Sequence, residues 1–156
     1  MNQALLNEYR IKSSDSDIVD LDSSTPQKFS RHLVFTKAVF KDTLHAGRFV
    51  SKLVLKLDAL IEAGSNELAC LVVNDGESSK RSYFIDQGVY SRNRNFRLYL
   101  SSKIGKETPL VAHATSGLNP PLNIQDESQH EAFFLNTLVS VTHWTDDMRI
   151  LTVISV

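Results

Sequence analysis

The hydrophobic positions along the chain predict one long amphipathic helix between two shorter ones. From Ala46 to Ala63, apolar residues recur three and four positions apart, which gathers on one helical face Val50, Leu53, Val54, Leu57, Leu60 and Ile61. Gly64 is expected to end this helix, because glycine readily adopts the left-handed conformation of a C-terminal cap. Shorter helices are predicted over Gln3–Tyr9 and Glu127–Val141, the latter with a buried side formed by Ala132, Phe133, Leu135, Leu138 and Val139.

Other segments carry the β-branched and aromatic residues that favour strands, separated by polar turns. The predicted strands are Lys28–Phe35, Glu67–Val73, Ser82–Val89 and Phe96–Leu100. The second and third of these flank Asn74-Asp75-Gly76-Glu77, a turn signal that predicts a hairpin. Met148–Val156 is so apolar that we expect it to be buried or paired. Loops are predicted over Lys12–Asp17 and Thr115–Asn123.

The composition of the chain excludes few classes of protein. The 156 residues have the length of one domain, and 17 Lys and Arg against 18 Asp and Glu give a net charge of -1, so bulk charge does not indicate a nucleic-acid partner. The single cysteine, Cys70, excludes an internal disulfide and a multi-cysteine zinc site, and its apolar surroundings predict a buried side chain. Met1–Arg10 contains too few consecutive apolar residues for a signal peptide or a membrane span. We therefore expect a soluble intracellular protein.

The distribution of charge changes the picture between Asp86 and Lys106. Five cations fall there with no acid after Asp86: Arg92, Arg94, Arg97, Lys103 and Lys106. Aromatic and amide side chains are interleaved with them: Tyr90, Asn93, Asn95, Phe96 and Tyr99. Cations with stacking faces are typical of single-stranded nucleic-acid sites. A solvated basic hairpin has the same pattern, and the residues alone leave both interpretations open.

Three side chains are candidates for chemistry, each with an ordinary structural alternative. Asp86 ends the apolar run Tyr83-Phe84-Ile85, where a carboxylate suits a hard cation such as Mg²⁺, or simply opens a turn toward Gly88. Ser30 and His32 are two residues apart and therefore share one face of a strand. A hydroxyl beside an imidazole suits the binding of a triphosphate or a nucleophile and base pair, and it also occurs without either role.

Two segments resemble the PrimPol-type primases of the archaeo-eukaryotic primase superfamily. Leu21–Phe35, with Ser30-Arg31-His32, resembles the second primase motif, Ser-x-His. Phe84–Lys106 resembles the third motif and the basic segment after it, through the long pattern Asp-x-Gly-Val-Tyr-x-x-Asn-Arg-Asn-Phe-Arg-Leu-Tyr. Weaker similarity covers Ala38–Val50 and Met148–Thr152. The resemblance implies an α/β (α+β) fold over residues 1–156. The chain would form the second half of a catalytic core, with an RRM-like mixed or antiparallel sheet and packing helices.

The resemblance also implies roles for individual residues. Asp86 would be a catalytic, metal-ligating carboxylate, and Arg94 and Asn95 would lie near the templating strand. Contacts with the incoming NTP or dNTP are implied for Lys28, Ser30, His32, Arg97 and Lys103. The implied reaction is template-directed nucleotidyl transfer on single-stranded DNA, with two Mn²⁺ or Mg²⁺ ions stabilising the attacking and leaving oxygens.

The chain departs from the family pattern at the residues that would bind metal ions. The first motif, Asp-x-Glu, has no counterpart; Asp15-Ser-Asp17 and Asp20-Leu-Asp22 mimic its spacing but are interpreted as unrelated, because Asp20–Asp22 runs directly into the Ser-x-His segment. Asp86 alone cannot assemble a two-metal site. No zinc is expected in this chain, because the zinc knuckle of the family is missing. The acidic motifs that bind single-strand-binding protein are missing too.

Three functions therefore stay open for the chain, which we expect to be a fragment or isoform. The first is a truncated primase/polymerase for re-priming and damage-tolerant synthesis at replication forks, in the nucleus and mitochondrion as the family implies, with no membrane partner. The second is a non-catalytic nucleotide or single-stranded-DNA-binding module. The third is a regulatory partner derived from a primase. The remaining histidines, His45, His113, His130 and His143, are interpreted as surface or packing residues, and Trp144 as a core residue.

Overall fold

The computed structural model describes residues 1–73, 82–117, 126–140, 144–146 and 148–153. The chain divides into two compact units. The first unit contains Phe40–Arg94 and Ile150–Val156, and the second contains Asn2–Val39 and Asn95–Arg149. Helices together with small antiparallel sheets give a mixed α and β architecture, which confirms the predicted fold class. None of the helices in the described ranges is both long and apolar enough to cross a membrane.

The second unit is built on a three-stranded antiparallel sheet in the order β2-β1-β5. The strands are β1 (Ile18–Asp22), β2 (Arg31–Phe35) and β5 (Val111–Ala112). In the register of β1 and β2, Leu21 lies opposite His32 and Asp22 lies opposite Arg31. Because side chains alternate along a strand, His32 shares a face with Leu21, and Arg31 projects from the other face.

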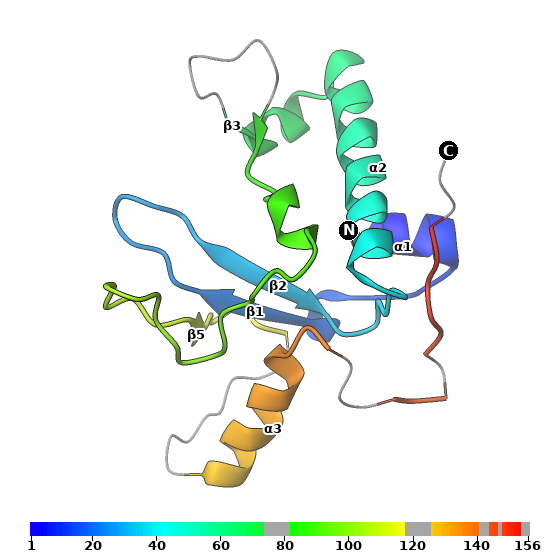
Figure 1. Ribbon diagram of the computed structural model, residues 1–156. Coiled ribbons are helices and arrows are strands. Elements are labelled where there is room, and N and C mark those ends of the chain that lie inside the picture. Colours follow the sequence, from blue (N-terminus) through cyan, green and yellow to red (C-terminus); the bar gives the residue numbers. More distant parts are fainter. Residues whose placement is uncertain (74–81, 118–125, 141–143, 147, 154–156) are drawn as a thin grey trace. The chain divides into compact units, whose positions relative to one another are not determined.

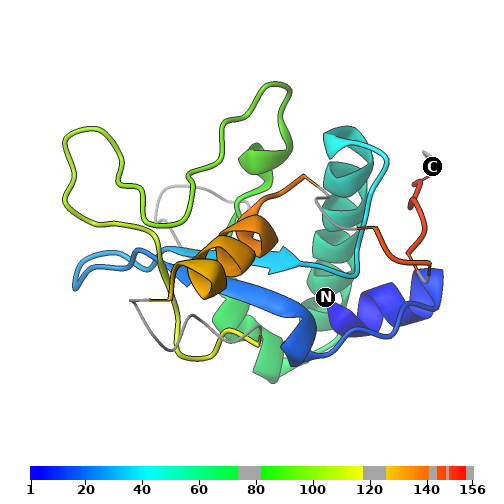
Figure 2. The same cartoon turned by 90° about the horizontal axis from the view of Figure 1, so that it is seen from below.

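The core of the second unit lies on the Leu21 face of this sheet. Val19 and Leu21 pack there with Leu110 and with Phe133 of α3 (Glu127–Thr137), the helix that lies against the sheet in Figures 1 and 2. Asp126 caps α3 by accepting hydrogen bonds from the first backbone N–H groups, as aspartate commonly does at this position. The short helix α1 (Asn2–Tyr9) agrees with its prediction and buries Leu5.

The first unit is organised by the predicted long helix, α2 (Thr43–Glu62). It begins at an Asp42 cap and buries Phe49, Val50 and Val54. It ends as predicted at Gly64, whose φ of 96° lies in the left-handed region. The Gly64 N–H donates to Ile61 O and the Ser65 N–H donates to Leu60 O, both at 3.0 Å, which is the Schellman pairing that satisfies the last helical carbonyls.

The predicted hairpin of the first unit exists but is much shorter than expected. Only β3 (Val72–Val73) and β4 (Ser82–Tyr83) pair, antiparallel; the turn Asn74–Glu77 lies outside the described residues. The flanking predicted strand residues form 3-10 turns at Asn66–Leu71 and Gln87–Tyr90. The second turn packs tightly on α2, since a Cβ on Gly47 would lie 2.9 Å from the Cβ of Tyr90.

The predicted strand Phe96–Leu100 is wrong. Leu100 has a φ of 64°, and a single left-handed residue breaks an extended run. Two backbone hydrogen bonds still tie this segment to its neighbour, from Leu100 N–H to Leu110 O at 2.8 Å and from Leu110 N–H to Ser101 O at 3.0 Å. The segment therefore lies beside the sheet without joining it as a ladder strand.

Several predictions of burial are also wrong. Cys70 is exposed, because it lies in a 3-10 turn and not in a strand, and the Trp144 side chain is 54% exposed. On α3, Ala132 is exposed, and Val139 is exposed because the helix has already ended. The apolar C-terminal segment is buried as expected at Leu151 and Val153, with a single parallel bridge from Leu151 to Phe40 in place of a strand.

Candidate functional site

The residues implied by the family resemblance are divided between the two units. Asp86 and Arg94 belong to the first unit. The second unit holds the larger set: Lys28, Ser30, His32, Asn95, Arg97 and Lys103.

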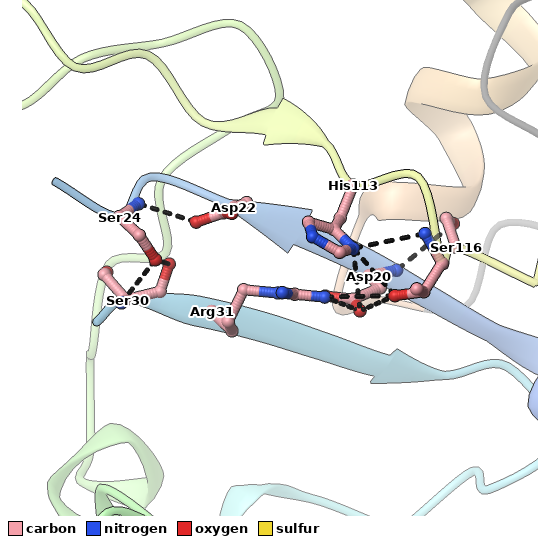
Figure 3. Close-up of polar contacts among 8 residues, drawn as sticks. Asp20, Asp22, Ser24, Ser30, Arg31, His113 and Ser116 are labelled. Carbon is pink, nitrogen blue, oxygen red and sulfur yellow. Dashed lines mark hydrogen bonds and ion pairs between the residues drawn. The ribbon is translucent and has the colours of Figure 1, made fainter. Parts of the chain in front are cut away.

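In the second unit, Ser23 joins Ser30 to Arg97. Ser23 follows β1 and Ser30 precedes β2, and the Ser23 N–H donates to Ser30 O at 2.9 Å. The Ser23 hydroxyl donates to Ser30 Oγ at 3.1 Å, while Arg97 Nη2 donates to Ser23 Oγ at 2.6 Å. The Ser30 N–H donates in turn to Ser24 Oγ at 2.9 Å (Figure 3). The start of the Ser-x-His motif is thereby fixed beside the basic segment.

Arg97 is held by neutral oxygens. Besides Ser23 Oγ, its guanidinium donates to the carbonyl oxygen of Thr108 at 3.2 Å. Its buried Nε has no hydrogen-bond partner. A buried donor without an acceptor costs free energy, and an ionised acceptor forms the stronger hydrogen bonds with a guanidinium. These contacts orient Arg97 and leave it suited to an anion.

Positive charge also surrounds His32. Burial lowers the pKa of His32, and the positive charges of Arg97 and Lys103 lower it further. The lowered pKa favours the neutral imidazole, which can donate a hydrogen bond through one ring nitrogen. Its ring makes an edge-to-face contact with Phe96 at a centroid distance of 6.2 Å. The cations that disfavour protonated His32 would equally favour a phosphate beside it.

The other second-unit candidates, Lys28, Lys103 and Asn95, are exposed. Lys28 lies in a tight turn, in which Thr25 and Lys28 exchange backbone hydrogen bonds. Lys103 begins another turn, closed by a hydrogen bond of 2.9 Å from the Lys106 N–H to Lys103 O. Asn95 is exposed at the start of the same segment. We use the name phosphate cluster below for Ser30, His32, Arg97 and Lys103.

The opposite face of the sheet carries a second polar group, centred on Asp20 (Figure 3). Asp20 is only 7% exposed, and both its carboxylate oxygens accept from the guanidinium of Arg31. Thr115 Oγ1 donates to the same carboxylate at 3.0 Å and lies 2.7 Å from His113 Nδ1. The hydrogen bond with Asp20 raises the pKa of Arg31. Asp20 therefore neutralises Arg31 within the protein, and Thr115 hydrogen-bonds to both members of the pair.

The other early aspartates also have local structural partners. Asp22 accepts a hydrogen bond of 2.6 Å from the Ser24 N–H, and the hydrogen bonds from Ser24 lower its pKa. Asp17 accepts from the backbone and hydroxyl of Ser14, both at 3.0 Å. With Asp20 paired to Arg31, each of these three carboxylates has a partner within the second unit.

Asp86 in the first unit adopts the turn geometry. It caps the 3-10 turn Gln87–Tyr90, and its Oδ1 accepts from the Gly88 N–H at 2.9 Å. Glycine permits this closure, because a Cβ on Gly88 would lie 3.0 Å from Asp86 Oδ1. Within the described ranges, no group of three or more His, Cys, Asp or Glu side chains is placed to hold a metal ion. One exposed carboxylate does not supply the ligand set of a two-metal centre.

Ser23 is the site residue that the sequence did not reveal. It is 74 residues from Arg97 along the chain, and neither its type nor its spacing distinguishes it from the neighbouring Ser24. The Asp20–Arg31 pair was likewise invisible, because a diagonal contact across two strands depends on their register.

No protein-family model matches the chain, but curated relatives do. The "DNA-directed primase/polymerase protein" of Mus musculus is 34% identical over 190 residues, which cover 96% of this chain and 35% of that protein. The proteins of the same name from Homo sapiens and Danio rerio are 32% and 35% identical, over 96% and 92% of this chain.

The chain spans about a third of the length of these relatives. Each alignment is longer than the chain itself, so the relatives carry residues inside the matched region that this chain does not. The similarity indicated by the Ser-x-His and third-motif segments is confirmed by these relatives over nearly the whole chain. This chain is a PrimPol-like sequence, homologous to part of the DNA-directed primase/polymerase proteins.

Proposed function

We propose that the phosphate cluster binds the triphosphate of an NTP or dNTP, as the nucleotide-binding part of a DNA primase/polymerase. The observation that carries the proposal is the state of Arg97, a half-buried guanidinium that donates to two neutral oxygens and has a buried Nε without a partner. A phosphate oxygen would supply the charged acceptor that these contacts lack.

Each residue of the cluster has a distinct part in this proposal. The planar guanidinium of Arg97 would bind a phosphate through two hydrogen bonds, and Lys103 would add a positive charge on a flexible side chain. Neutral His32 and the Ser30 hydroxyl would donate to the remaining oxygens. The same cations would offset the charge that develops on pyrophosphate as it leaves the α-phosphorus, which is where fixed positive charge assists phosphoryl transfer.

Template binding is a second part of the proposal. Arg94 and Asn95 are exposed and follow the left-handed residue Asn93, whose φ of 58° turns the chain at this point. A guanidinium and an amide in an exposed segment suit the backbone and bases of single-stranded DNA. A role in re-priming and damage tolerance at replication forks, in nucleus and mitochondrion, belongs to the same proposal and rests on the family resemblance alone.

One observation favours the alternative of a non-catalytic nucleotide or single-stranded-DNA-binding module, or a regulatory partner. The Asp86 carboxylate is engaged by the Gly88 N–H, and the described residues near it do not form a metal-binding group. Nucleotide binding at the phosphate cluster is common to both proposals, whereas extension of a primer belongs only to the first.

Binding of a fluorescent dNTP to the 156-residue chain, in a buffer with EDTA, tests the shared part. We expect saturable binding that weakens strongly in Arg97→Gln and remains unchanged in Arg92→Gln, a matched removal of an exposed arginine from the same basic segment. Equal affinities in the two variants would contradict the proposal.

Primer extension and de novo priming with Mn²⁺ and Mg²⁺ separate the two functions. Extension by the chain that is lost in Asp86→Ala supports the catalytic proposal. Nucleotide binding without extension supports the binding module. Extension that survives Asp86→Ala would contradict the assignment of Asp86 as a metal ligand.

A further inference from the structure

A second group of cations in the second unit surrounds a pocket of about 420 Å³. The pocket is lined by Arg10, Ile11, Lys12, Lys37, Met148 and Arg149. Four of these residues are Lys or Arg, and none is acidic. None of them belongs to the phosphate cluster or to the basic segment between Asp86 and Lys106. In a chain with a net charge of -1, this concentration of positive charge is a local feature.

The pocket is built from three separate segments. Arg10 and Ile11 follow α1, where Arg10 adopts a φ of 59° and the two N–H groups donate to Leu6 O and Leu5 O. Lys37 lies in the turn after β2, closed by a hydrogen bond of 3.1 Å from the Ala38 N–H to Phe35 O. Met148 and Arg149 follow a turn in which the Met148 N–H donates to Thr145 O at 2.9 Å.

The lining residues differ in exposure. Arg10, Lys12 and Arg149 are exposed, whereas Ile11, Lys37 and Met148 are half-buried. Three of the four cations are therefore the most exposed residues of the pocket, and Ile11 and Met148 are less exposed, together with the fourth cation, Lys37. Pockets that hold small ligands or single groups of a larger one are typically about 300–1,000 Å³, so the volume is sufficient for a nucleotide-sized group.

We propose that this pocket binds a single-stranded nucleic acid, with phosphates at the exposed cations and a sugar or base against Ile11 and Met148. Arginine side chains suit phosphates because they offer paired donors, and a flexible thioether adapts to a flat ring. The less exposed apolar groups favour a nucleic-acid strand as the ligand and not a bilayer. A base can insert into the pocket, whereas a flat membrane surface would contact only the exposed cations. The inference does not depend on the phosphate cluster.

The test measures the affinity of a fluorescein-labelled oligothymidylate by anisotropy over a range of salt concentrations. The pocket variant combines Arg10→Gln, Lys12→Gln and Arg149→Gln. The control variant combines Lys41→Gln, Arg48→Gln and Lys56→Gln in the first unit, which removes the same charge from outside the pocket. Both variants therefore change long-range electrostatics by the same net charge.

We expect the pocket variant to bind the oligonucleotide about tenfold more weakly at low salt. The slope of log affinity against log salt should fall by about 2, because each neutralised phosphate on a single strand contributes about 0.7. The control variant should keep both values. Fluorescent dNTP binding should be unchanged in the pocket variant, so that failure here is distinct from failure of the phosphate cluster.

Two outcomes would overturn the inference. Equal loss in the pocket and control variants would mean that net charge, and not this pocket, sets the affinity. Loss of binding to vesicles that contain phosphatidylserine, with oligothymidylate binding retained, would assign the pocket to lipid headgroups. If the triple variant fails to fold, the exposed single substitution Arg149→Gln should still lower the salt slope by about 0.7.

Discussion

Arg31 and Arg97 lie in the same unit, and their positive charges are met in different ways. Arg31 projects from one face of the β2-β1-β5 sheet and forms a bidentate ion pair with buried Asp20. Arg97 donates to Ser23 Oγ and Thr108 O, both neutral, and leaves its Nε without a partner. Both guanidinium groups are held by hydrogen bonds, but of the two it is Arg31 whose charge is paired with a carboxylate.

The difference separates a structural charge from a functional one. A guanidinium paired with a buried carboxylate is neutralised within the protein, and removing either partner exposes the other to a dry environment. A guanidinium fixed by neutral oxygens keeps its attraction for anions, and it depresses the pKa of nearby His32. Variants of Arg31 and its partner should therefore lower mainly the stability of the fold. Variants of Arg97 and its partner should lower mainly the affinity for an anionic ligand.

The largest effect is expected for Asp20→Ala. It leaves the charge of Arg31 without its carboxylate in a largely buried position, which should lower the free energy of unfolding by about 3 kcal/mol. Urea denaturation measures this change. Asp22→Ala is the matched control on the same strand, and because its main partner is the exposed Ser24 N–H, it should cost about 1 kcal/mol or less. Equal costs would show that the Asp20–Arg31 pair has no special weight.

Arg97→Gln and Arg31→Gln should give the converse pattern. Because a hydrogen bond to a charged group contributes about 1.5–3 kcal/mol, Arg97→Gln should weaken triphosphate binding about tenfold or more, with little change in stability. Arg31→Gln leaves Asp20 without its cation, so it should lower stability while the folded protein keeps its affinity. Titrations with dNTP, read beside denaturation curves, check both. A ligand affinity that follows stability in both variants would remove the distinction.

His32 should report ligand binding through its titration. Its pKa in the folded chain is lowered by burial and by Arg97 and Lys103, so below pH about 6.5 the unfolded chain binds more protons and stability falls. A bound triphosphate should raise the pKa of His32, because it offsets the charges of both Arg97 and Lys103. The substitution Lys103→Gln should raise this pKa less, because it removes one of the two charges. NMR titration of the imidazole signals measures these shifts. A pKa that stays unchanged with saturating dNTP would place the phosphates elsewhere.

The smallest effect is expected for Ser23→Ala. It removes the oxygen that orients Arg97 and the hydroxyl that donates to Ser30, while the charge of the cluster stays the same. A single neutral hydrogen bond contributes about 1 kcal/mol, so dNTP affinity should fall about fivefold. Ser128→Ala at the start of α3 is the control and should leave affinity unchanged. Identical affinities for both variants would show that Ser23 does not position Arg97.

Local patterns predicted the parts of the fold that depend on neighbours in sequence. The long helix α2 and its end at Gly64 followed from apolar spacing and from the conformational freedom of glycine. The strand Phe96–Leu100 was predicted from residue types alone and is wrong, because Leu100 adopts a left-handed φ of 64° that no strand propensity anticipates. Cys70 was predicted to be buried on the same basis, and the 3-10 turn around it leaves it exposed.

The sequence by itself determined that this chain is similar to PrimPol-type primases, since the Ser-x-His and third-motif segments are contiguous residues that need no structure to be recognised. It also determined which cations are available. Only the tertiary structure decided which of them are neutralised. Arg31 meets Asp20 through the register of two strands, and Arg97 meets Ser23 across 74 residues of chain. Such pairings depend on distances in space, because electrostatic interactions follow separation and burial and not position along the sequence.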